Sequence, residues 1–535
     1  MKFYLYKYIF VIFGIIISCP LYALASGINY GKIISQSADS FVLQYGNTET
    51  PDFYNCAVSA LSCSDIGKTA PLAIENQTAN ANARFTFSTT STSKKNIITR
   101  SFYLKDNATG KIYSRSYKLD FWDMLGDENT ISSISPDEKR MVYTDDSSGY
   151  PTLYQLDLTA LKGNKFKGAK VFSKAFSING FTLASQNDLY FIANKDGPYE
   201  WNLYKYNFTT KVISLIANNA SYAFRIRKFG NGFIFFAIQG ASSFPVFYNE
   251  ETNQVEKFSG ITADNSPSAV NSRVMSFGGN MHGVLMTPQN FNKNAPHELV
   301  IWLHGGPYRQ TSLGYDSYAS YAVYDLILNE MAKNNIAVLK LDYSGSYGYG
   351  GAFAKSIKGN VGNKDVSDVM NALSSIKKGM VISDIYLMGN SYGGYLSLRS
   401  IVAYPKQFDG AISINGVTDW ATMLSDLGNS IFNLDFNGKP NKSNKKLYDK
   451  ASIISRISNL ANQKIILIQA QADKTIPPSQ ADLLYKVLQD KGKNVLFYPY
   501  ADEDHIFKKT ASIEGICKNV FTALSISLDN NCNFE

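Results

Sequence analysis

The sequence predicts an α/β chain in which an all-β region, residues 26–270, precedes a mostly parallel, doubly wound sheet, residues 271–535. In the first region, short runs of β-branched and aromatic residues alternate with Gly, Asn, Asp and Ser turns. In the second region, strand-like runs alternate with helix-like ones. The chain of 535 residues is also too long for one ordinary domain.

The first 25 residues have the pattern of a secretory signal peptide. Lysines precede an apolar run that Pro20 ends, and an A-x-A cleavage site finishes at Ala25. The run is too short to span a bilayer comfortably. We therefore expect cleavage near Ala25, export to the periplasm or the medium, and no stable membrane span in the mature chain. Lipidation at Cys19 and an uncleaved anchor are the alternatives.

The all-β region contains a weakly repeated unit of two strands. The unit recurs about every 44–50 residues, and the region is long enough for five or six four-stranded blades. We therefore expect a β-propeller, with a pair of β-sandwiches as the alternative. The repeated pairs are 141–143 with 153–158, 189–191 with 203–208, and 233–236 with 246–249.

The second region contains the elements of a parallel sheet with crossover helices. Most of its strand runs are continuously apolar, as expected when helices cover both faces of a sheet. The predicted strands are 298–303, 336–341, 384–388, 410–414, 464–469 and 494–498, and the predicted helices are 321–333, 365–378, 392–403 and 479–490.

Residues 389–395 read Gly-Asn-Ser-Tyr-Gly-Gly-Tyr and contain the only G-x-S-x-G pattern of the chain. This pattern is the nucleophile elbow of α/β-hydrolases, in which a serine occupies a strained turn between a strand and a helix. A predicted strand and a predicted helix flank it here. We therefore predict a C-terminal α/β-hydrolase domain with Ser391 as its nucleophile.

The general base and its acid follow from chain order, because the triad of this fold runs serine, acid, histidine. Only one of the four histidines follows Ser391, so His505 is the predicted base. Asp473 is the predicted acid, since it follows a buried strand at the sheet edge where catalytic groups gather. Asp502 and Asp504 are nearer to His505 in sequence, but we expect them to be solvated loop charges.

Two backbone N–H groups are predicted to form the oxyanion hole, those of Tyr392 and Gly306. Gly306 belongs to the turn His304-Gly305-Gly306-Pro307, which ends a predicted strand. A glycine-rich turn lets backbone amides approach a developing oxyanion without a side-chain clash. We expect His304 and Gly305 to brace this loop beside the site.

The four cysteines beyond the leader fall into two pairs that are close in sequence. In an oxidising compartment we expect the disulfides Cys56–Cys63 and Cys517–Cys532, with four buried thiols as the alternative. No histidine lies close in sequence to either pair, so a zinc site is not expected. The net charge of +8 is not concentrated in any long basic run, so no nucleic-acid partner is expected either.

Taken together, these motifs resemble those of the prolyl oligopeptidase family of serine peptidases, in particular its acylaminoacyl-peptidase-like and dipeptidyl-peptidase-like bacterial members. The resemblance implies a propeller over the active site, hydrolysis of short peptides, and no metal or organic cofactor. The similar segments are HGGP at 304–307, GYG at 348–350, GNSYGGY at 389–395, D-x-x-I-P-x-x-Q at 473–480 and D-E-x-H-x-F at 502–507.

The chain departs from the family pattern in three places. Ser344 occurs where the family often has arginine, Gln469-Ala470 replaces a common His-Gly before the acid, and Asp504 replaces a glycine before the histidine. The N-terminal region is also short for a complete seven- or eight-bladed propeller. These departures leave the triad intact and bear on specificity and on how closed the active site is.

Two other functions are compatible with the same sequence. One is an esterase or lipase of the same fold, because a triad does not separate amide from ester hydrolysis. The other is a catalytically silent propeller protein that binds a peptide or an envelope partner. The sequence leaves side-chain specificity, exo- or endopeptidase action and oligomeric state open.

Overall fold

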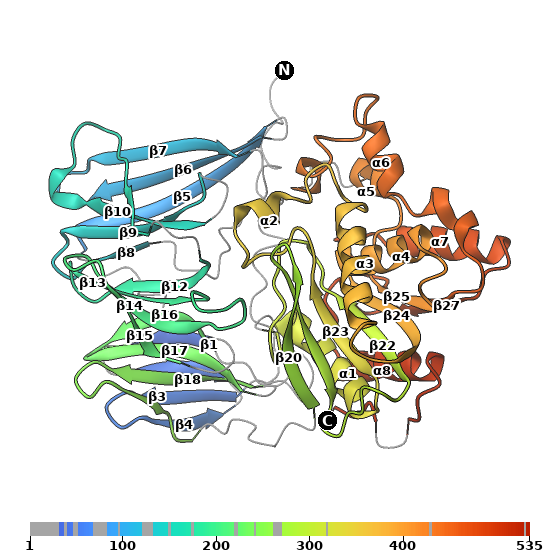
Figure 1. The fold of residues 1–535 in the computed structure, drawn as a ribbon. Coiled ribbons are helices and arrows are strands. Elements are labelled where there is room, and N and C mark those ends of the chain that lie inside the picture. The colour runs from blue at the N-terminus through green and yellow to red at the C-terminus, as the bar shows by residue number, and fades with distance from the viewer. Residues whose placement is uncertain are drawn as a thin grey trace.

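In the computed structural model, the described residues form five small antiparallel sheets followed by one large sheet (Figure 1). The signal-peptide prediction for residues 1–25 lies outside the described part of the chain. The described residues are 32–36, 40–45, 52–67, 83–94, 97–119, 132–147, 151–172, 176–218, 223–239, 242–260, 270–316, 319–426, 431–528 and 531–534.

Each small sheet is an antiparallel meander whose strands are neighbours in sequence. The repeated two-strand units of the sequence are the hairpins β9–β10, β13–β14 and β17–β18, the central pairs of three consecutive sheets. The sheets are β1–β4 (Lys32–Gln36, Ser40–Tyr45, Asp52–Ala57, Ser62–Gly67), β5–β7 (Phe85–Lys94, Ile97–Asp106, Ile112–Leu119), β8–β11 (Ser132–Ile134, Arg140–Asp145, Thr152–Asp157, Ala169–Lys170), β12–β15 (Ile178–Leu183, Asp188–Ala193, Asn202–Asn207, Ile213–Ala217) and β16–β19 (Ala223–Phe229, Gly232–Gln239, Ser242–Asn249, Gln254–Lys257).

The first and last small sheets pack against each other. Phe41 of β2 shares an apolar cluster with Phe247 of β18, and its ring lies 5.4 Å from that of Phe258. The backbone amide of Cys63 donates to the carbonyl of Ser259 at 2.9 Å. Radial repetition of small sheets, with the last one meeting the first, is the architecture of a β-propeller.

The large sheet has eight strands in the order β20-β21-β23-β22-β24-β25-β26-β27. Its first two strands are antiparallel, and the neighbours from β23 to β27 run parallel. The predicted fold class is confirmed in both regions. The strands are β20 (Val270–Gly278), β21 (Met281–Pro288), β22 (His297–Leu303), β23 (Ala337–Asp342), β24 (Ile382–Asn390), β25 (Gly410–Ile414), β26 (Lys464–Ala470) and β27 (Val495–Tyr500).

Helices cover both faces of this sheet, because its strands alternate apolar side chains between the two sides. Along β22, Leu299, Ile301 and Leu303 share a cluster with α3, α4 and α7, whereas Val300 and Trp302 share one with α1 and α8. The helices are α1 (Ala319–Lys333), α2 (Gly351–Lys355), α3 (Lys364–Ile376), α4 (Tyr392–Ala403), α5 (Trp420–Asp426), α6 (Lys445–Ala451), α7 (Ser479–Asp490) and α8 (Thr510–Ala523), and the short 3-10 helices are η1 (Leu158–Ala160), η2 (Ile431–Leu434) and η3 (Ile454–Asn459).

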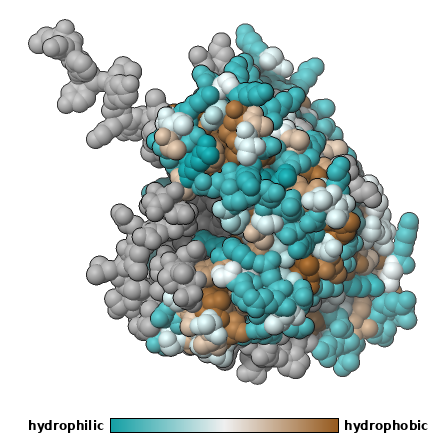
Figure 2. Space-filling view, turned by 90° about the vertical axis from the view of Figure 1, so that its left-hand side faces the viewer, coloured by the Kyte–Doolittle hydropathy of each residue, from teal (hydrophilic) through white to brown (hydrophobic). Residues whose placement is uncertain are grey.

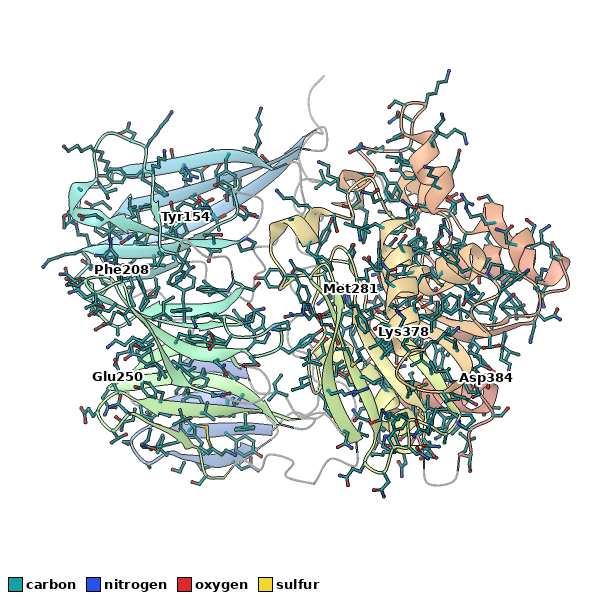
Figure 3. The ribbon with its side chains drawn as sticks, in the orientation of Figure 1. Tyr154, Phe208, Glu250, Met281, Lys378 and Asp384 are labelled. Carbon is teal, nitrogen blue, oxygen red and sulfur yellow. A yellow bond between two sulfur atoms is a disulfide. The ribbon has the colours of Figure 1, made fainter. Side chains whose placement is uncertain are left out.

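The small sheets turn one end toward the large sheet and the other end away from it (Figure 1). Phe208 and Glu250, which follow β14 and β18, lie on the side away from the large sheet (Figure 3). That side is mostly hydrophilic in its described atoms, with scattered apolar patches (Figure 2). Across the described ranges, no helix combines the length and the hydropathy needed to cross a membrane.

Candidate active site

Ser391 occupies the junction between β24 and α4. Its backbone has φ 57° and ψ −119°, a conformation that a residue with a side chain adopts only under strain. Its amide donates to the carbonyl of Ile414 at the end of β25, at 2.8 Å. This is the strand–turn–helix setting that the G-x-S-x-G pattern predicts.

Gly393 allows the start of α4 to pack against the end of β22. A Cβ atom at this position would lie 1.8 Å from the carbonyl oxygen of Leu303, so no other residue fits. The contact matters because Leu303 directly precedes the glycine-rich turn at 304–307. The elbow and the turn predicted to form the oxyanion hole are therefore packed together.

Asp473 and His505 are brought together by two adjacent strands, β26 and β27. The distance from the imidazole Nδ1 to the carboxylate Oδ2 of Asp473 is 2.7 Å. The other carboxylate oxygen accepts the amides of Thr475 and Ile476, each at 2.8 Å, which fixes its orientation. Because Nδ1 donates to a carboxylate, Nε2 is left as the basic nitrogen of the ring.

Among the described residues, neither Asp502 nor Asp504 hydrogen bonds to the ring of His505. The Asp502 side chain is 82% exposed. Asp504 is exposed as well, and its carboxylate accepts the backbone amide of His505 at 2.6 Å. Glu503, between them, is buried and accepts the amides of Lys508 and Lys509, which holds the loop to the start of α8.

Asn415, at the end of β25, connects the surroundings of Ser391 with those of His505. Its side-chain amide donates to the carbonyl of His505 at 3.0 Å, and its side-chain oxygen accepts the amide of Ala470 at 2.8 Å. The preceding residue, Ile414, accepts the amide of Ser391. The ends of β24, β25, β26 and β27 therefore gather all three predicted triad residues at one edge of the sheet.

Among the described residues, no hydrogen bond joins the Ser391 hydroxyl to the His505 ring. In serine hydrolases this bond often tightens only when the substrate binds. The Ser391 side chain is 6% exposed, and the ring of His505 is part-buried beside the same edge. The geometry thus pairs the acid with the base and places the nucleophile on the neighbouring elbow.

Tyr392, which follows the nucleophile, is anchored by its side chain. Its hydroxyl donates to the buried carboxyl of Asp365 on α3 at 2.7 Å, and its ring stacks on Tyr343. Burial, followed by the Asp365 charge, holds the pKa of the Tyr392 phenol well above its usual range. Burial also raises the pKa of Asp365 to about 6. The backbone amide predicted to donate to the oxyanion therefore belongs to a rigidly held residue.

The turn at 304–307 meets the elbow through Gly305. A Cβ atom there would lie 2.9 Å from the Asn390 carbonyl and 3.1 Å from the Ser391 Cβ. His304 is buried, stacks on Tyr343, and hydrogen bonds through Nε2 to the Ser346 hydroxyl at 2.9 Å. These contacts brace the turn. Gly306 has φ 46°, and the nearest atom to a Cβ at this position would be Nε of Arg309, at 3.6 Å.

Sequence reasoning did not single out several polar residues that hold the site. Asp365, Asn415 and Glu503 are buried. Asp365 binds the residue after Ser391, Asn415 binds the carbonyl of His505, and Glu503 binds two amides of the loop that follows His505. For Asp365 and Asn415 the one signal in the sequence is a polar side chain beside an apolar segment, which many solvated residues share. Glu503 belongs to the segment D-E-x-H-x-F at 502–507, whose pattern does not give it a role. In the described part of the chain, no three His, Cys, Asp or Glu side chains are grouped to hold a metal.

Residues 323–520 match the model of the prolyl oligopeptidase family. The chain is 28% identical over 230 residues to dipeptidyl aminopeptidase BIII of Pseudoxanthomonas mexicana, covering 40% of this chain and 31% of that protein. It is 26% identical over 360 residues to dipeptidyl peptidase 4 of Sus scrofa, covering 62% of this chain and 44% of that protein. The matches thus span less than half of each relative.

The fold is also similar to that of solved structures. A puromycin-hydrolyzing peptidase of Mycobacterium tuberculosis superimposes with a TM-score of 0.66 at 17% identity, covering 93% of this chain and 79% of that one. Dipeptidyl peptidase 4 of Porphyromonas gingivalis superimposes with a TM-score of 0.65 at 13% identity, covering 94% and 72%. At these identities the likeness concerns the fold.

Proposed function

The chain matches the prolyl oligopeptidase family over residues 323–520, and from this premise we propose that the protein is a serine peptidase that hydrolyses short peptides. The observation that carries the proposal is the 2.7 Å pair of His505 and Asp473 at the sheet edge that also holds the strained elbow of Ser391. No metal or organic cofactor takes part in the proposed chemistry.

In the proposed mechanism, the Ser391 Oγ attacks the carbonyl carbon of the scissile bond while Nε2 of His505 takes the hydroxyl proton. Asp473 orients the ring and stabilises the imidazolium. The amides of Tyr392 and Gly306 hold the oxyanion. His505 then gives its proton to the leaving amine, and water releases the acyl group from Ser391 by the same steps in reverse.

Short peptides are the proposed substrates because the small sheets contact the large sheet beside the site. Tyr117 of β7 packs on Leu434, and Tyr199, which precedes β14, donates to Asp342 at the end of β23. A cover held this close to the edge restricts the size of a polypeptide that can reach Ser391.

The test combines a fluorophosphonate probe with peptide anilides and short acyl esters. The wild-type protein should be labelled and should cleave the anilides, whereas Ser391→Ala should lose both labelling and turnover while it keeps its melting temperature. Ser400→Ala is the matched control, because Ser400 is a buried serine on α4, the helix that follows Ser391, and its hydroxyl is unpartnered among the described residues. This control should retain full activity.

Each alternative function predicts a different outcome of the same test. Turnover of esters without any cleavage of anilides would replace the peptidase with an esterase or lipase. Folded wild-type protein that the probe does not label, and that turns over neither substrate, would favour a binding protein.

We also propose that the protein is exported after cleavage near Ala25. The support is that both predicted disulfides, Cys56–Cys63 and Cys517–Cys532, are formed, as is usual in oxidising compartments. Intact mass of the protein recovered from periplasm and medium should show the loss of residues 1–25. Recovery of a full-length chain with free thiols from the cytoplasm would contradict export.

A further inference from the structure

The loop at 194–201, between β13 and β14, reaches from the small sheets into the large one. It leaves the end of the β13–β14 hairpin opposite to Phe208, which lies on the side away from the large sheet (Figure 3). Tyr199 of this loop is 2% exposed and belongs to the apolar cluster of α1, α8 and the large sheet. One aromatic side chain of the N-terminal region is thus part of the core of the C-terminal one.

The hydroxyl of Tyr199 binds a carboxylate at the carboxyl end of β23. It donates to Oδ2 of Asp342 at 2.9 Å, and the hydroxyl of Tyr349 donates to the same oxygen at 2.5 Å. Burial, followed by the Asp342 charge, holds the pKa of both phenols well above the usual range. Both hydroxyls therefore remain protonated donors across the physiological pH range.

Asp342 connects this loop with the turn that follows β22. Its Oδ1 lies 3.3 Å from Nε2 of His304 and accepts the amide of Thr311 at 2.8 Å. His304 begins the turn at 304–307, whose next residue, Gly305, packs on the elbow of Ser391. A continuous set of buried contacts thus runs from Tyr199 through Asp342 and His304 to the nucleophile.

The contact is reciprocal, which fixes the position of the loop. Tyr347 of the C-terminal region packs against the apolar cluster of the small sheets that contains Trp201 and Tyr190. The side-chain amide of Asn194 donates to the carbonyl of Gly348 at 3.1 Å, and that of Gln310 donates to the carbonyl of Pro198 at 2.8 Å. Each region therefore holds a tyrosine of the other.

We propose that Tyr199 is a positioning residue for the turn at 304–307, so that the N-terminal region sets the geometry of the oxyanion hole in addition to covering the site. The inference rests on the proposed function. Tyr199 acts through Asp342 and His304, so its removal should disturb the transition state more than substrate binding.

The first test is Tyr199→Phe, which removes one hydroxyl and keeps the ring in the core. We expect kcat on a peptide anilide to fall about tenfold while KM changes less than about twofold, because small misplacements of catalytic groups have large effects on rate. Labelling of Ser391 by a fluorophosphonate should slow by a similar factor.

Tyr248→Phe is the matched control. Tyr248 is also 2% exposed, and its hydroxyl bonds to Asn253 within its own sheet at 2.9 Å, without contact to Asp342. It should lower the melting temperature to a similar extent and leave kcat unchanged. This separates positioning from a general loss of stability.

A double-mutant cycle with Asp342→Asn tests the route of the effect. Tyr199→Phe should cause little further loss of kcat in the Asp342→Asn background, because the two residues act through one contact. Three results would overturn the inference. They are a kcat of Tyr199→Phe equal to that of wild type, a loss of kcat equal to that of Tyr248→Phe, and additive losses of kcat in the double-mutant cycle. An inactive wild-type protein would instead contradict the proposed function.

Discussion

Asp435, in the loop after η2, is a buried carboxyl beside the turn at 304–307. The hydroxyl of Tyr308 donates to its Oδ1, while its Oδ2 is buried without a hydrogen-bond partner among the described residues. Burial raises the pKa of Asp435 to about 7, and the Tyr308 hydrogen bond and the charge of Lys358 oppose that rise in part. An aspartate in an unfolded chain titrates near about 3.9.

The raised pKa predicts that stability falls as the pH rises. The folded protein binds the proton of Asp435 more tightly than the unfolded chain does. The contribution of this group to the free energy of unfolding is therefore fully present below about pH 4, and it is lost as the pH rises through about 7. Asp435→Asn cannot ionise. The melting temperature of Asp435→Asn should therefore rise relative to that of wild type across this window. At pH 8 the difference in the free energy of unfolding should be roughly a few kcal/mol.

Asp365→Asn provides the matched comparison for the same measurement, thermal unfolding from pH 4 to pH 8. Burial raises the pKa of Asp365 to about 6. The difference in melting temperature between Asp365→Asn and wild type should therefore have the same sign, and it should level off about one pH unit lower than for Asp435→Asn. A difference between Asp435→Asn and wild type that stays constant, or falls, over this range would contradict the assignment.

At the scale of residues, the sequence predicts the groups that react more readily than those that hold them. Ser391 has a glycine-rich signature, chain order selects His505, and the place directly after a buried strand selects Asp473. Tyr199 and Asp342 have no such signature, because their contact depends on how two regions separated by 143 residues meet. A buried hydroxyl–carboxylate pair leaves no periodicity in either segment.

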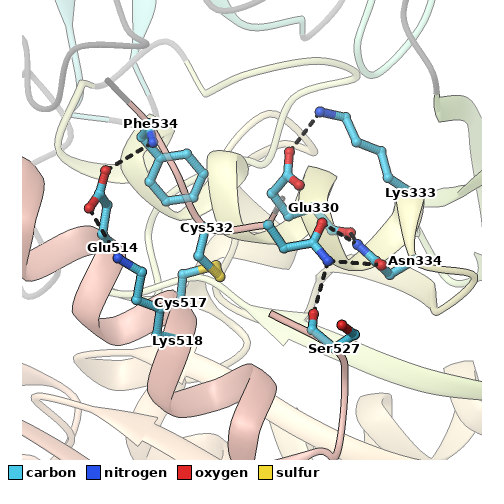
Figure 4. The surroundings of a disulfide bond; sticks show 10 residues. Glu330, Lys333, Asn334, Glu514, Cys517, Lys518, Ser527, Cys532 and Phe534 are labelled. Atoms are coloured by element: carbon cyan, nitrogen blue, oxygen red, sulfur yellow. Dashed lines mark hydrogen bonds and ion pairs between the residues drawn. A yellow bond between two sulfur atoms is a disulfide. The ribbon is translucent and has the colours of Figure 1, made fainter. Parts of the chain in front are cut away.

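The helix α8 and the tail that follows it are joined covalently near the end of the chain. Cys517 of α8 pairs with Cys532, and the amide of Phe534 donates to Glu514 on the same helix at 3.0 Å (Figure 4). Asn531 and Asn334 exchange side-chain hydrogen bonds, which attach the tail to the end of α1. The tail therefore closes one side of the core that underlies β26 and β27.

We predict that Cys517→Ser/Cys532→Ser destabilises the C-terminal region. The disulfide spans 15 residues, and a loop of that length contributes about 3 kcal/mol by restricting the unfolded chain. The melting temperature should fall by roughly 6–12 °C, and the amides of α8 should exchange with solvent faster.

The control for this prediction is Cys56→Ser/Cys63→Ser, in the β3–β4 hairpin of the first small sheet. This variant also removes one disulfide, but far from α8, so it should leave the amide hydrogen exchange of α8 unaltered. Equal protection of α8 in wild type and in Cys517→Ser/Cys532→Ser would show that the tail is held without the disulfide.

Among the elements of the C-terminal region, three have the bounds that the sequence predicts. The helices 392–403 and 479–490 and the strand 410–414 have the predicted bounds, and the helix predicted at 365–378 ends at Ile376. The hairpin β20–β21 was missed. Most residues of β20 are exposed because the strand lies at the sheet edge, so its sequence lacks the apolar run that marks the central strands.

At the scale of the whole molecule, the repeat length was the informative signal. A period of about 44–50 residues predicts one four-stranded sheet per repeat. The central hairpins of three such sheets, β9–β10, β13–β14 and β17–β18, are formed by the apolar runs that repeat in the sequence. The first small sheet lies outside this repeat in sequence, and its place beside the last sheet required the structure. The contact between Tyr199 of the small sheets and Asp342 of the large sheet is also a property of the assembled chain.

The pairing of the first small sheet with the last has a consequence for biosynthesis. Leu61 and Ser259, which hydrogen bond to each other, are 198 residues apart. At a synthesis rate of about 5–20 residues per second, the ribosome needs on the order of 10–40 s to make the intervening chain. During that interval the apolar face around Phe41 lacks the residues of the last small sheet that it packs against. A nascent chain therefore depends on chaperones, or on export in an unfolded state, until Phe258 has left the ribosome.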